Sequence, residues 1–209
     1  MLYFIKKHIL RSKDIPRRYD QIFTEIKRLK PKNIMEIGVW SGERARRMIE
    51  IASRYNKPTT INYFGFDFFE RMDSETFQKE VSKQPPPQEV VQSKLLKTGA
   101  SINLIKGDTT QTLRNEQGKH PSMDIIFIDG GHSLETVESD WQNAKTFMHK
   151  GSVLIFDDYW TNRIDAGAKR TVDAIDRNEF SVEIMPVVDS FDNTSFGRLV
   201  IQLAKVTKL

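Results

Sequence analysis

The chain has 209 residues, 38% of them hydrophobic and 29% charged, and its 32 basic and 28 acidic residues give a net charge of +4. These values predict one globular domain over residues 1–209, and they exclude a stapled mini-protein and two full catalytic domains. The absence of cysteine excludes disulfides and thiolate metal sites, and no apolar run approaches the roughly 20 residues of a membrane span, so we expect a cytoplasmic protein.

Residues 1–32 are rich in basic side chains and are expected to form an N-terminal helical extension. Apolar residues recur there at helical spacing, as one stripe made of Tyr19, Ile22, Phe23, Ile26 and Leu29. The surrounding charge suits a solvated helix face, and these helices could also pack against a second copy of the chain. RNA remains an alternative partner, but no aromatic residues alternate with the basic ones for base stacking.

Strands and helices alternate along most of the chain. Short apolar runs predict strands over residues 33–37, 61–66, 102–105, 124–128 and 152–156. The helix after the first strand directs Arg44, Arg47 and Arg54 largely outward. Such alternation implies parallel strands with right-handed crossovers, and two further strand-like runs, at 181–188 and 198–206, predict an antiparallel C-terminal hairpin. The predicted fold class is a doubly wound, Rossmann-like α/β domain.

Residues 68–100 interrupt this alternation. The segment is long, polar and broken by Pro85, Pro86 and Pro87, which excludes a simple crossover helix. It is either a lid over a ligand or a surface insertion with short helices.

A turn with two glycines, Gly38 and Gly42, joins the first strand to the first helix. Glycine there lets the backbone approach a ligand that a Cβ would block. The dinucleotide fingerprint is absent, because Trp40 and Glu43 stand where its other glycines belong. Glu36 and Glu43 would repel a pyrophosphate, whereas Glu36 suits a cationic or zwitterionic ligand.

Acidic residues follow the next two strands. Asp67 can accept hydrogen bonds from both hydroxyls of a ribose, and Asp108 can accept one from an adenine amino group. Each alone is more often an ordinary helix cap or loop residue. Together, at successive strand ends, they favour an adenosine-containing cofactor.

With these residues the chain resembles the class I S-adenosylmethionine-dependent methyltransferases, from residue 34 to the C-terminal hairpin. The stretch from Glu36 through Gly38 to Gly42 matches their first motif in a shortened form, Asp67 matches their ribose acid and Asp108 their adenine-side acid. The resemblance implies S-adenosylmethionine as the cofactor and a seven-stranded sheet, mostly parallel, with an antiparallel last strand.

Three more carboxylates follow the fourth and fifth strands: Asp129, Asp157 and Asp158. Neighbouring parallel strands lie about 4.8 Å apart, so these side chains are expected to share one space above the sheet. Carboxylates this close repel one another, and a hard divalent cation relieves the repulsion. The sequence therefore predicts a site for Mg²⁺ or Mn²⁺, two ions that the sequence does not distinguish.

The stretch from Asp129 to His132, together with Asp157 and Asp158, resembles the metal-dependent O-methyltransferases of the macrocin type, which methylate sugar hydroxyls. The resemblance implies that the three aspartates ligate the metal, that Asp129 also belongs to the catalytic and cofactor-binding residues, and that His132 is the general base. The acceptor is then a hydroxyl of a sugar or another polar small molecule. The alternatives are an RNA methyltransferase, a cofactor-binding module without catalysis, and a structural role for His132 at a helix start.

Overall fold

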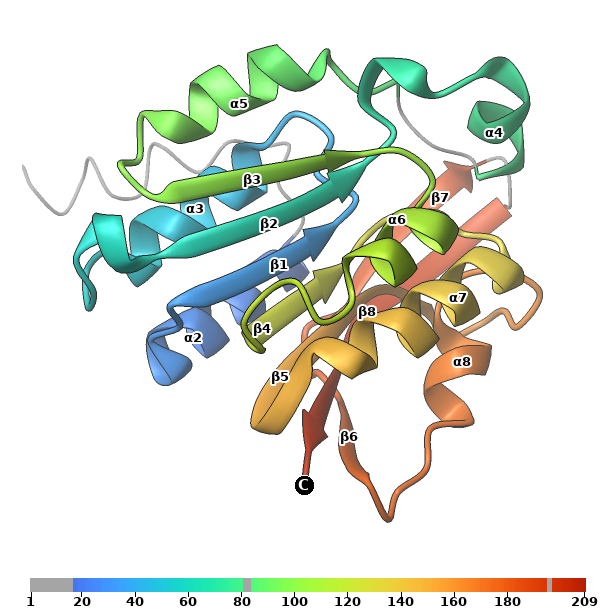
Figure 1. The fold of residues 1–209 in the computed structure, drawn as a ribbon. Coiled ribbons are helices and arrows are strands. Elements are labelled where there is room, and N and C mark those ends of the chain that lie inside the picture. Colours follow the sequence, from blue (N-terminus) through green and yellow to red (C-terminus); the bar gives the residue numbers. More distant parts are fainter. Residues whose placement is uncertain (1–16, 81–83, 195–196) are drawn as a thin grey trace, which may run out of the picture.

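One eight-stranded sheet runs through the molecule and has helices on both faces (Figure 1). The computed structural model describes residues 17–80, 84–194 and 197–209. The strands are β1 (Asn33–Ile37), β2 (Asn62–Asp67), β3 (Ser101–Lys106), β4 (Met123–Ile128), β5 (Met148–Trp160), β6 (Phe180–Ile184), β7 (Asp189–Thr194) and β8 (Gly197–Lys208). Their order in the sheet is β3-β2-β1-β4-β5-β8-β6, and β7 pairs with β8 outside this path.

The predicted fold class is confirmed. Strands β1 to β5 are parallel, and β8 runs antiparallel between β5 and β6. The first four strands match their predicted bounds within one residue, whereas β5 is longer at both ends. The seven expected strands form the continuous order of the sheet, and β7 adds an eighth that occupies part of the polar stretch between the two predicted hairpin strands. Its residues have low strand propensity, and pairing with β8 overrides that preference.

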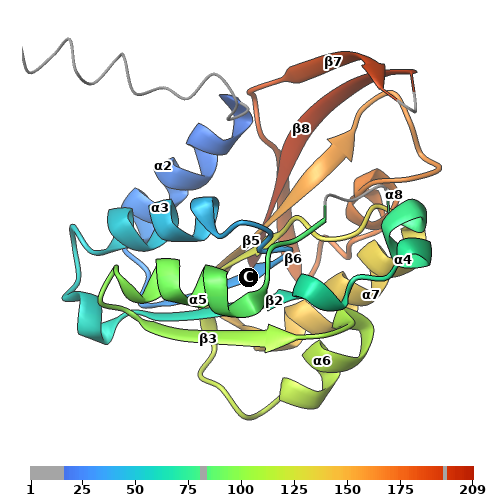
Figure 2. The ribbon, with the colours of Figure 1, turned by 90° about the horizontal axis from the view of Figure 1, so that it is seen from above.

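Helices cover the sheet in two layers (Figure 2). One face carries α2 (Asp20–Leu29), α3 (Glu43–Ala52) and α5 (Gln88–Leu96), and the other carries α6 (Thr109–Glu116), α7 (Leu134–Ala144) and α8 (Lys169–Asp173). Side chains alternate along each strand, so that in β4 Phe127 packs under the first layer and Ile126 under the second. None of the helices in the described ranges is long and apolar enough to cross a membrane.

The N-terminal helical extension is described only from Arg17 onward, and residues 1–16 of that prediction lie outside the described part. A short 3₁₀ helix, η1 (Arg17–Tyr19), leads directly into α2. Ile22 and Ile26 of the apolar stripe are fully buried in this chain's own core, and Leu29 packs against it partly buried. That stripe is therefore used within the chain, and the packing of a second copy stays a prediction.

The segment 68–100 divides at its prolines. Val91 and Leu95 of α5 are fully buried in the core, so α5 is a crossover helix between β2 and β3, contrary to the expectation that the segment holds none. The part before the prolines forms η3 (Phe69–Arg71) and α4 (Ser74–Lys79). These two lie at the end of the sheet where the parallel strands finish (Figure 1).

The order of the strands creates a crevice at this end of the sheet. β1 lies between β2 and β4, so the connection that leaves β1 and the connection that leaves β4 diverge to opposite faces. In doubly wound sheets, ligands bind where such connections diverge. The β1–α3 turn and the end of β4 therefore form the two walls of the expected site.

Asp140 of α7 is an unusual member of the core, since only 1% of it is exposed. Neither carboxyl oxygen has a hydrogen-bond partner of ordinary geometry within the described residues, although the nearby Thr109 hydroxyl favours the charged form. Burial outweighs that contact and raises the pKa of Asp140 to about 7, and the charges of Asp108 and Glu80 add to the shift. Asp140 is therefore largely protonated in the folded protein below neutral pH.

We expect Asp140→Asn to stabilise the protein, and to do so more at pH 8 than at pH 5. Between about pH 4 and pH 7 the folded state keeps a proton that the unfolded state has lost, so the free energy of unfolding falls as pH rises, by up to about 4 kcal/mol. The amide does not titrate, and the variant avoids this loss. Urea unfolding at both pH values measures the effect, and a variant less stable than the parent at pH 8 would contradict it.

Candidate functional site

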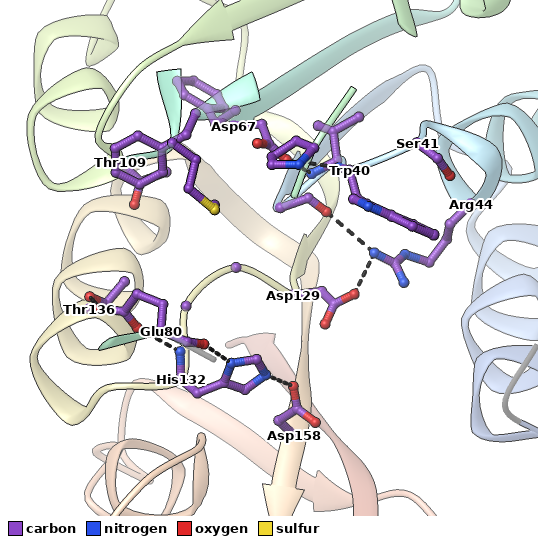
Figure 3. A pocket seen from close by; sticks show the side chains of 18 of the residues that line it. Trp40, Ser41, Arg44, Asp67, Glu80, Thr109, Asp129, His132, Thr136 and Asp158 are labelled. Carbon is purple, nitrogen blue, oxygen red and sulfur yellow. Dashed lines mark hydrogen bonds and ion pairs between the residues drawn. The ribbon is translucent and has the colours of Figure 1, made fainter. Parts of the chain in front are cut away.

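A cavity of about 990 Å³ opens at the carboxyl ends of the parallel strands (Figure 3). Its walls come from the β1–α3 turn, the ends of β2, β4 and β5, the start of the chain at η1, and the segment from η3 to α4. The predicted site residues that line it are Gly38, Asp67, Asp108, Asp129, His132 and Asp158. Glu36, Gly42 and Asp157 are not among its lining residues.

The two glycines of the turn serve packing inside the chain. Both have positive φ, +86° at Gly38 and +70° at Gly42. A Cβ on Gly38 would lie 1.9 Å from the backbone oxygen of Asp129, and one on Gly42 would lie 2.8 Å from the side chain of Val91. Gly42 makes room for α5 behind the turn and does not line the cavity, so its cofactor role stays a prediction. Gly38 lines the cavity and also lets the turn touch the end of β4.

Asp67 holds the turn from the neighbouring strand. Its Oδ2 accepts hydrogen bonds from the backbone N–H of Val39 and Trp40, both at 2.8 Å, and Oδ1 accepts one from Phe69. Burial raises the pKa of Asp67, and these hydrogen bonds oppose that shift. A carboxylate offers about four acceptor positions, so at most one remains for a ligand. The predicted bidentate contact with a ribose is therefore reduced to one hydroxyl.

Asp108 is both a helix cap and a cavity residue. Its Oδ1 accepts hydrogen bonds from the backbone N–H and the hydroxyl of Thr110, at 2.9 and 2.7 Å, at the start of α6. The cap leaves Oδ2 without a hydrogen bond to the described part of the chain, and Asp108 lines the cavity. Asp108 can therefore cap α6 and still offer one oxygen to a ligand in the cavity.

Arg44 takes the position that was expected for a ligand cation. Its Nε donates to Oε1 of Glu36 at 2.8 Å, and Tyr63 donates to the other oxygen. Glu36 is fully buried, and its predicted contact with a cationic ligand is not supported because its oxygens are already bonded. The prediction that Arg44 faces largely outward is wrong, because its guanidinium bonds the buried Glu36. It reaches into the cavity and forms an ion pair with Asp129 at 2.5 Å (Figure 3).

The three predicted metal ligands do come together. One oxygen from each of Asp129, Asp157 and Asp158 lies within 4.8 Å of the others. Burial raises the pKa of Asp129 well above its usual value, Arg44 opposes this, and the other two carboxylates reinforce it. The three carboxylates converge as the sequence predicts, with Asp157 buried and the other two partly exposed.

The spacing of the three carboxylates fits a divalent cation, but Asp157 has no acceptor position left for one. Asp157, 3% exposed, accepts four hydrogen bonds: from Nε and Nη2 of Arg18 at 2.7 and 2.9 Å, from the Tyr19 hydroxyl at 2.6 Å, and from the backbone N–H of Asp158 at 2.8 Å. These bonds use all of its roughly four acceptor positions. A metal bound to Asp157 would have to displace Arg18 or Tyr19.

His132 is held between two acceptors. Its Nδ1 lies 2.5 Å from the backbone oxygen of Glu80, and its Nε2 lies 2.8 Å from Oδ2 of Asp158. A carbonyl and an ionised carboxylate only accept, so both ring nitrogens carry hydrogen. Burial opposes the charge, but Asp158 and the Glu80 carbonyl outweigh it and raise the pKa of His132 to about 10. The ring is an imidazolium, so this geometry does not support the predicted role of general base.

Glu80, which was not predicted as a site residue, fixes the loop that carries His132. Its carboxylate accepts hydrogen bonds from the backbone N–H of His132 and Ser133, at 2.8 and 2.9 Å, and from the hydroxyls of Ser133 and Thr136, both at 2.8 Å. Glu80 thus caps the start of α7 from outside the helix. It also ties the segment that holds α4 to the end of β4.

We expect Glu80→Gln to destabilise the protein by about 1–3 kcal/mol, because hydrogen bonds to a charged acceptor are lost and the amide turns a donor toward other donors. The His132 ring should also lose its fixed place, and its pKa should fall below the value of about 10. Urea unfolding and NMR titration of the ring measure the two effects. Glu75→Gln, on the exposed side of α4, is the matched control. An unchanged His132 titration would contradict the positioning role.

Comparison with known proteins agrees with the fold. A model of the methyltransferase domain family matches residues 35–159, from β1 to the end of β5. An O-methyltransferase from Bacillus cereus in complex with SAH is 16% identical, with 99% of this chain and 88% of that chain covered and a TM-score of 0.63. TomG, an O-methyltransferase from Streptomyces achromogenes in complex with SAM, is 15% identical, with 97% and 85% covered and a TM-score of 0.61.

A viral relative matches over a shorter stretch. An uncharacterized protein of Acanthamoeba polyphaga mimivirus is 27% identical over 77 residues, which is 35% of this chain and 35% of that protein. The match thus spans about a third of that relative. The family model covers more than half of the chain, and the chain therefore belongs to the methyltransferase domain family, with the fold of the O-methyltransferases.

Proposed function

We propose that the protein is an S-adenosylmethionine-dependent O-methyltransferase that acts on a hydroxyl of a polar small molecule, such as a sugar-containing one. The observation that carries the proposal is the place of Asp129 at the end of β4. Its carboxylate lines the cavity between the glycine turn and the pair formed by His132 and Asp158 (Figure 3). A base in this place lies between a cofactor on one side and an acceptor on the other.

The cofactor side of the cavity consists of Gly38, Trp40, Asp67 and Asp108. The turn that carries Gly38 and Trp40 would lie against the amino acid part of the cofactor, the open position on Asp67 would take one ribose hydroxyl, and Oδ2 of Asp108 would take the adenine amino group. When bound, S-adenosylmethionine supplies an electrophilic methyl group on a sulfonium. This assignment is supported by the strand ends from which these residues come, since ligands of doubly wound sheets bind there.

The acceptor side consists of Tyr19, Arg47, His132, Asp158 and Phe191. It combines aromatic surface with charged groups, which suits a polar molecule with an apolar part. Two of the cavity's cations, Arg18 and Arg44, already bond to carboxylates of the protein, which makes them poor contacts for the phosphates of RNA. This observation favours a small acceptor over the RNA alternative.

Asp129 takes the proton in the proposed reaction. The acceptor O–H gives its proton to the carboxylate, and the oxygen forms a bond to the methyl carbon as the carbon–sulfur bond breaks toward sulfur. Arg44 holds the carboxylate of Asp129 in place, and the His132 imidazolium, whose two N–H groups already bond Glu80 and Asp158, adds positive charge at this side of the cavity. Burial raises the pKa of Asp129, which makes it a stronger base than an exposed aspartate.

Calorimetric titration with S-adenosylmethionine, with NAD as the control, tests the cofactor. Saturable binding of the sulfonium compound alone is expected, and no binding would overturn the proposal. Purified protein and cofactor would then be incubated with hydroxylated small molecules, and formation of S-adenosylhomocysteine would be followed. Cofactor binding without transfer to any hydroxyl would favour a module without catalysis, whereas transfer to RNA that weakens as salt rises would favour the RNA alternative.

A further inference from the structure

The side chain of Arg18 lies within the cluster of Asp129, Asp157 and Asp158. Although it lies at the start of the described chain, only 4% of it is exposed. Its guanidinium binds Asp157 in a bidentate manner and lies 3.9 Å from Asp158. Such fork-shaped pairing fixes both the distance and the orientation of the two groups. The guanidinium therefore lies where a cation shared by these two carboxylates would lie.

Several contacts hold Arg18 in this place. Its backbone N–H and its Nη1 both lie near Oδ2 of Asp189, at 3.1 and 3.3 Å, which ties η1 to β7. Its guanidinium carbon lies 4.7 Å from the centre of the Tyr19 ring, and the hydroxyl of Tyr19 also donates to Asp157. These contacts join η1, β5 and β7, and they hold the guanidinium of Arg18 against the cluster.

Arg44 pairs with the carboxylate of Asp129 in a similar manner. It bridges Asp129 and Glu36, and its guanidinium carbon lies 4.8 Å from the ring centre of Tyr19 and 4.7 Å from that of Phe127. Two guanidiniums thus flank Tyr19 and pair with two of the three aspartates. The third, Asp158, pairs with His132.

We propose that Arg18 and Arg44 take the place of a divalent cation in this methyltransferase, so that the cluster of Asp129, Asp157 and Asp158 works without metal and Arg18 is the group that keeps a metal out. The inference deepens the proposed function, because it concerns how the same site neutralises its carboxylates. Removing Arg18 should open two oxygens on Asp157 beside the other two carboxylates, and oxygen donors with this spacing bind Mn²⁺ and Mg²⁺.

Titration with Mn²⁺, followed by the EPR signal of the free ion, tests the inference without any acceptor. The parent should show no saturable Mn²⁺ binding in the millimolar range. Arg18→Ala should gain one Mn²⁺ site, with an affinity at least tenfold above that of any weak binding by the parent. Arg18→Ala combined with Asp157→Asn should lose this site. Arg17→Ala changes an exposed arginine on the same 3₁₀ helix and should behave like the parent.

Two results of the Mn²⁺ titrations would overturn the inference. One is Mn²⁺ binding by the parent that Asp157→Asn removes, a measurement that does not depend on how well the Arg18 variant folds. The other is a folded Arg18→Ala variant that gains no site. Methyl transfer that persists in EDTA supports the inference. Transfer that requires Mn²⁺ or Mg²⁺ would refute it and leave the proposed O-methyl transfer intact, whereas failure to bind S-adenosylmethionine would instead remove the proposed function.

Discussion

Gly38→Ala is expected to destabilise the protein by about 3 kcal/mol or more and to abolish binding of S-adenosylmethionine. A Cβ at this position would lie 1.9 Å from the backbone oxygen of Asp129 and 2.7 Å from the backbone nitrogen of Gly130. Backbone atoms of a central strand cannot move aside as a flexible side chain can, so the turn itself has to shift. Urea unfolding and calorimetric titration with the cofactor measure the two effects.

Gly151→Ala separates the clash from the backbone strain. Gly38 and Gly151 both have φ of +86°, but a Cβ at Gly151 would meet no atom within 4 Å. The control should therefore show only the cost of a left-handed alanine, about 1–2 kcal/mol, and should bind the cofactor normally. Equal losses in the two variants would mean that contact between the turn and the end of β4 does not limit the site.

The sheet and the ends of its central strands could be predicted from the sequence because their signals are local. Each buried strand is a short apolar run, and the residue after it lies at the carboxyl edge whatever the rest of the chain does. This is why Asp67, Asp108, Asp129 and Asp158 were found, and why they all line the cavity. The extra strand β7 was missed because its polar residues become a strand only through pairing with β8.

The partners of these acids could not be predicted, because they come from distant parts of the chain. Arg18 binds Asp157 across 139 residues, and Glu80 binds the N–H of His132 across 52. Helical spacing places Arg44 on the polar side of α3, yet a long side chain in the first turn of a helix can reach back over the preceding strand. Sequence pattern shows where charges lie along an element, and only the packed structure shows which charges meet.

Asp129→Asn is expected to lower turnover by roughly 10²–10⁴-fold, the usual contribution of a general base, while the protein stays folded. The amide keeps the shape of the side chain but cannot take a proton. Without the carboxylate of Asp129, Arg44 forms an ion pair with Glu36 alone. Initial rates with the acceptor found by screening, at saturating cofactor, measure the effect. The matched control is Asp165→Asn, an aspartate exposed by 65% that pairs only with Arg163 in the described part of the chain and should leave the rate unchanged.

The pH dependence of the parent distinguishes Asp129 from His132 as the base. A base acts when it is deprotonated, so a rate that depends on Asp129 should fall on the acid side, at a pH above the usual carboxylate range because burial raises the pKa of Asp129. If His132 were the base, the rate would keep rising until pH approaches its pKa of about 10. A profile that reaches its plateau without rising further toward pH 10, and is lost in Asp129→Asn, would assign the proton to the carboxylate at the end of β4. Substantial activity in that variant, with a rise toward pH 10, would assign it to the histidine instead.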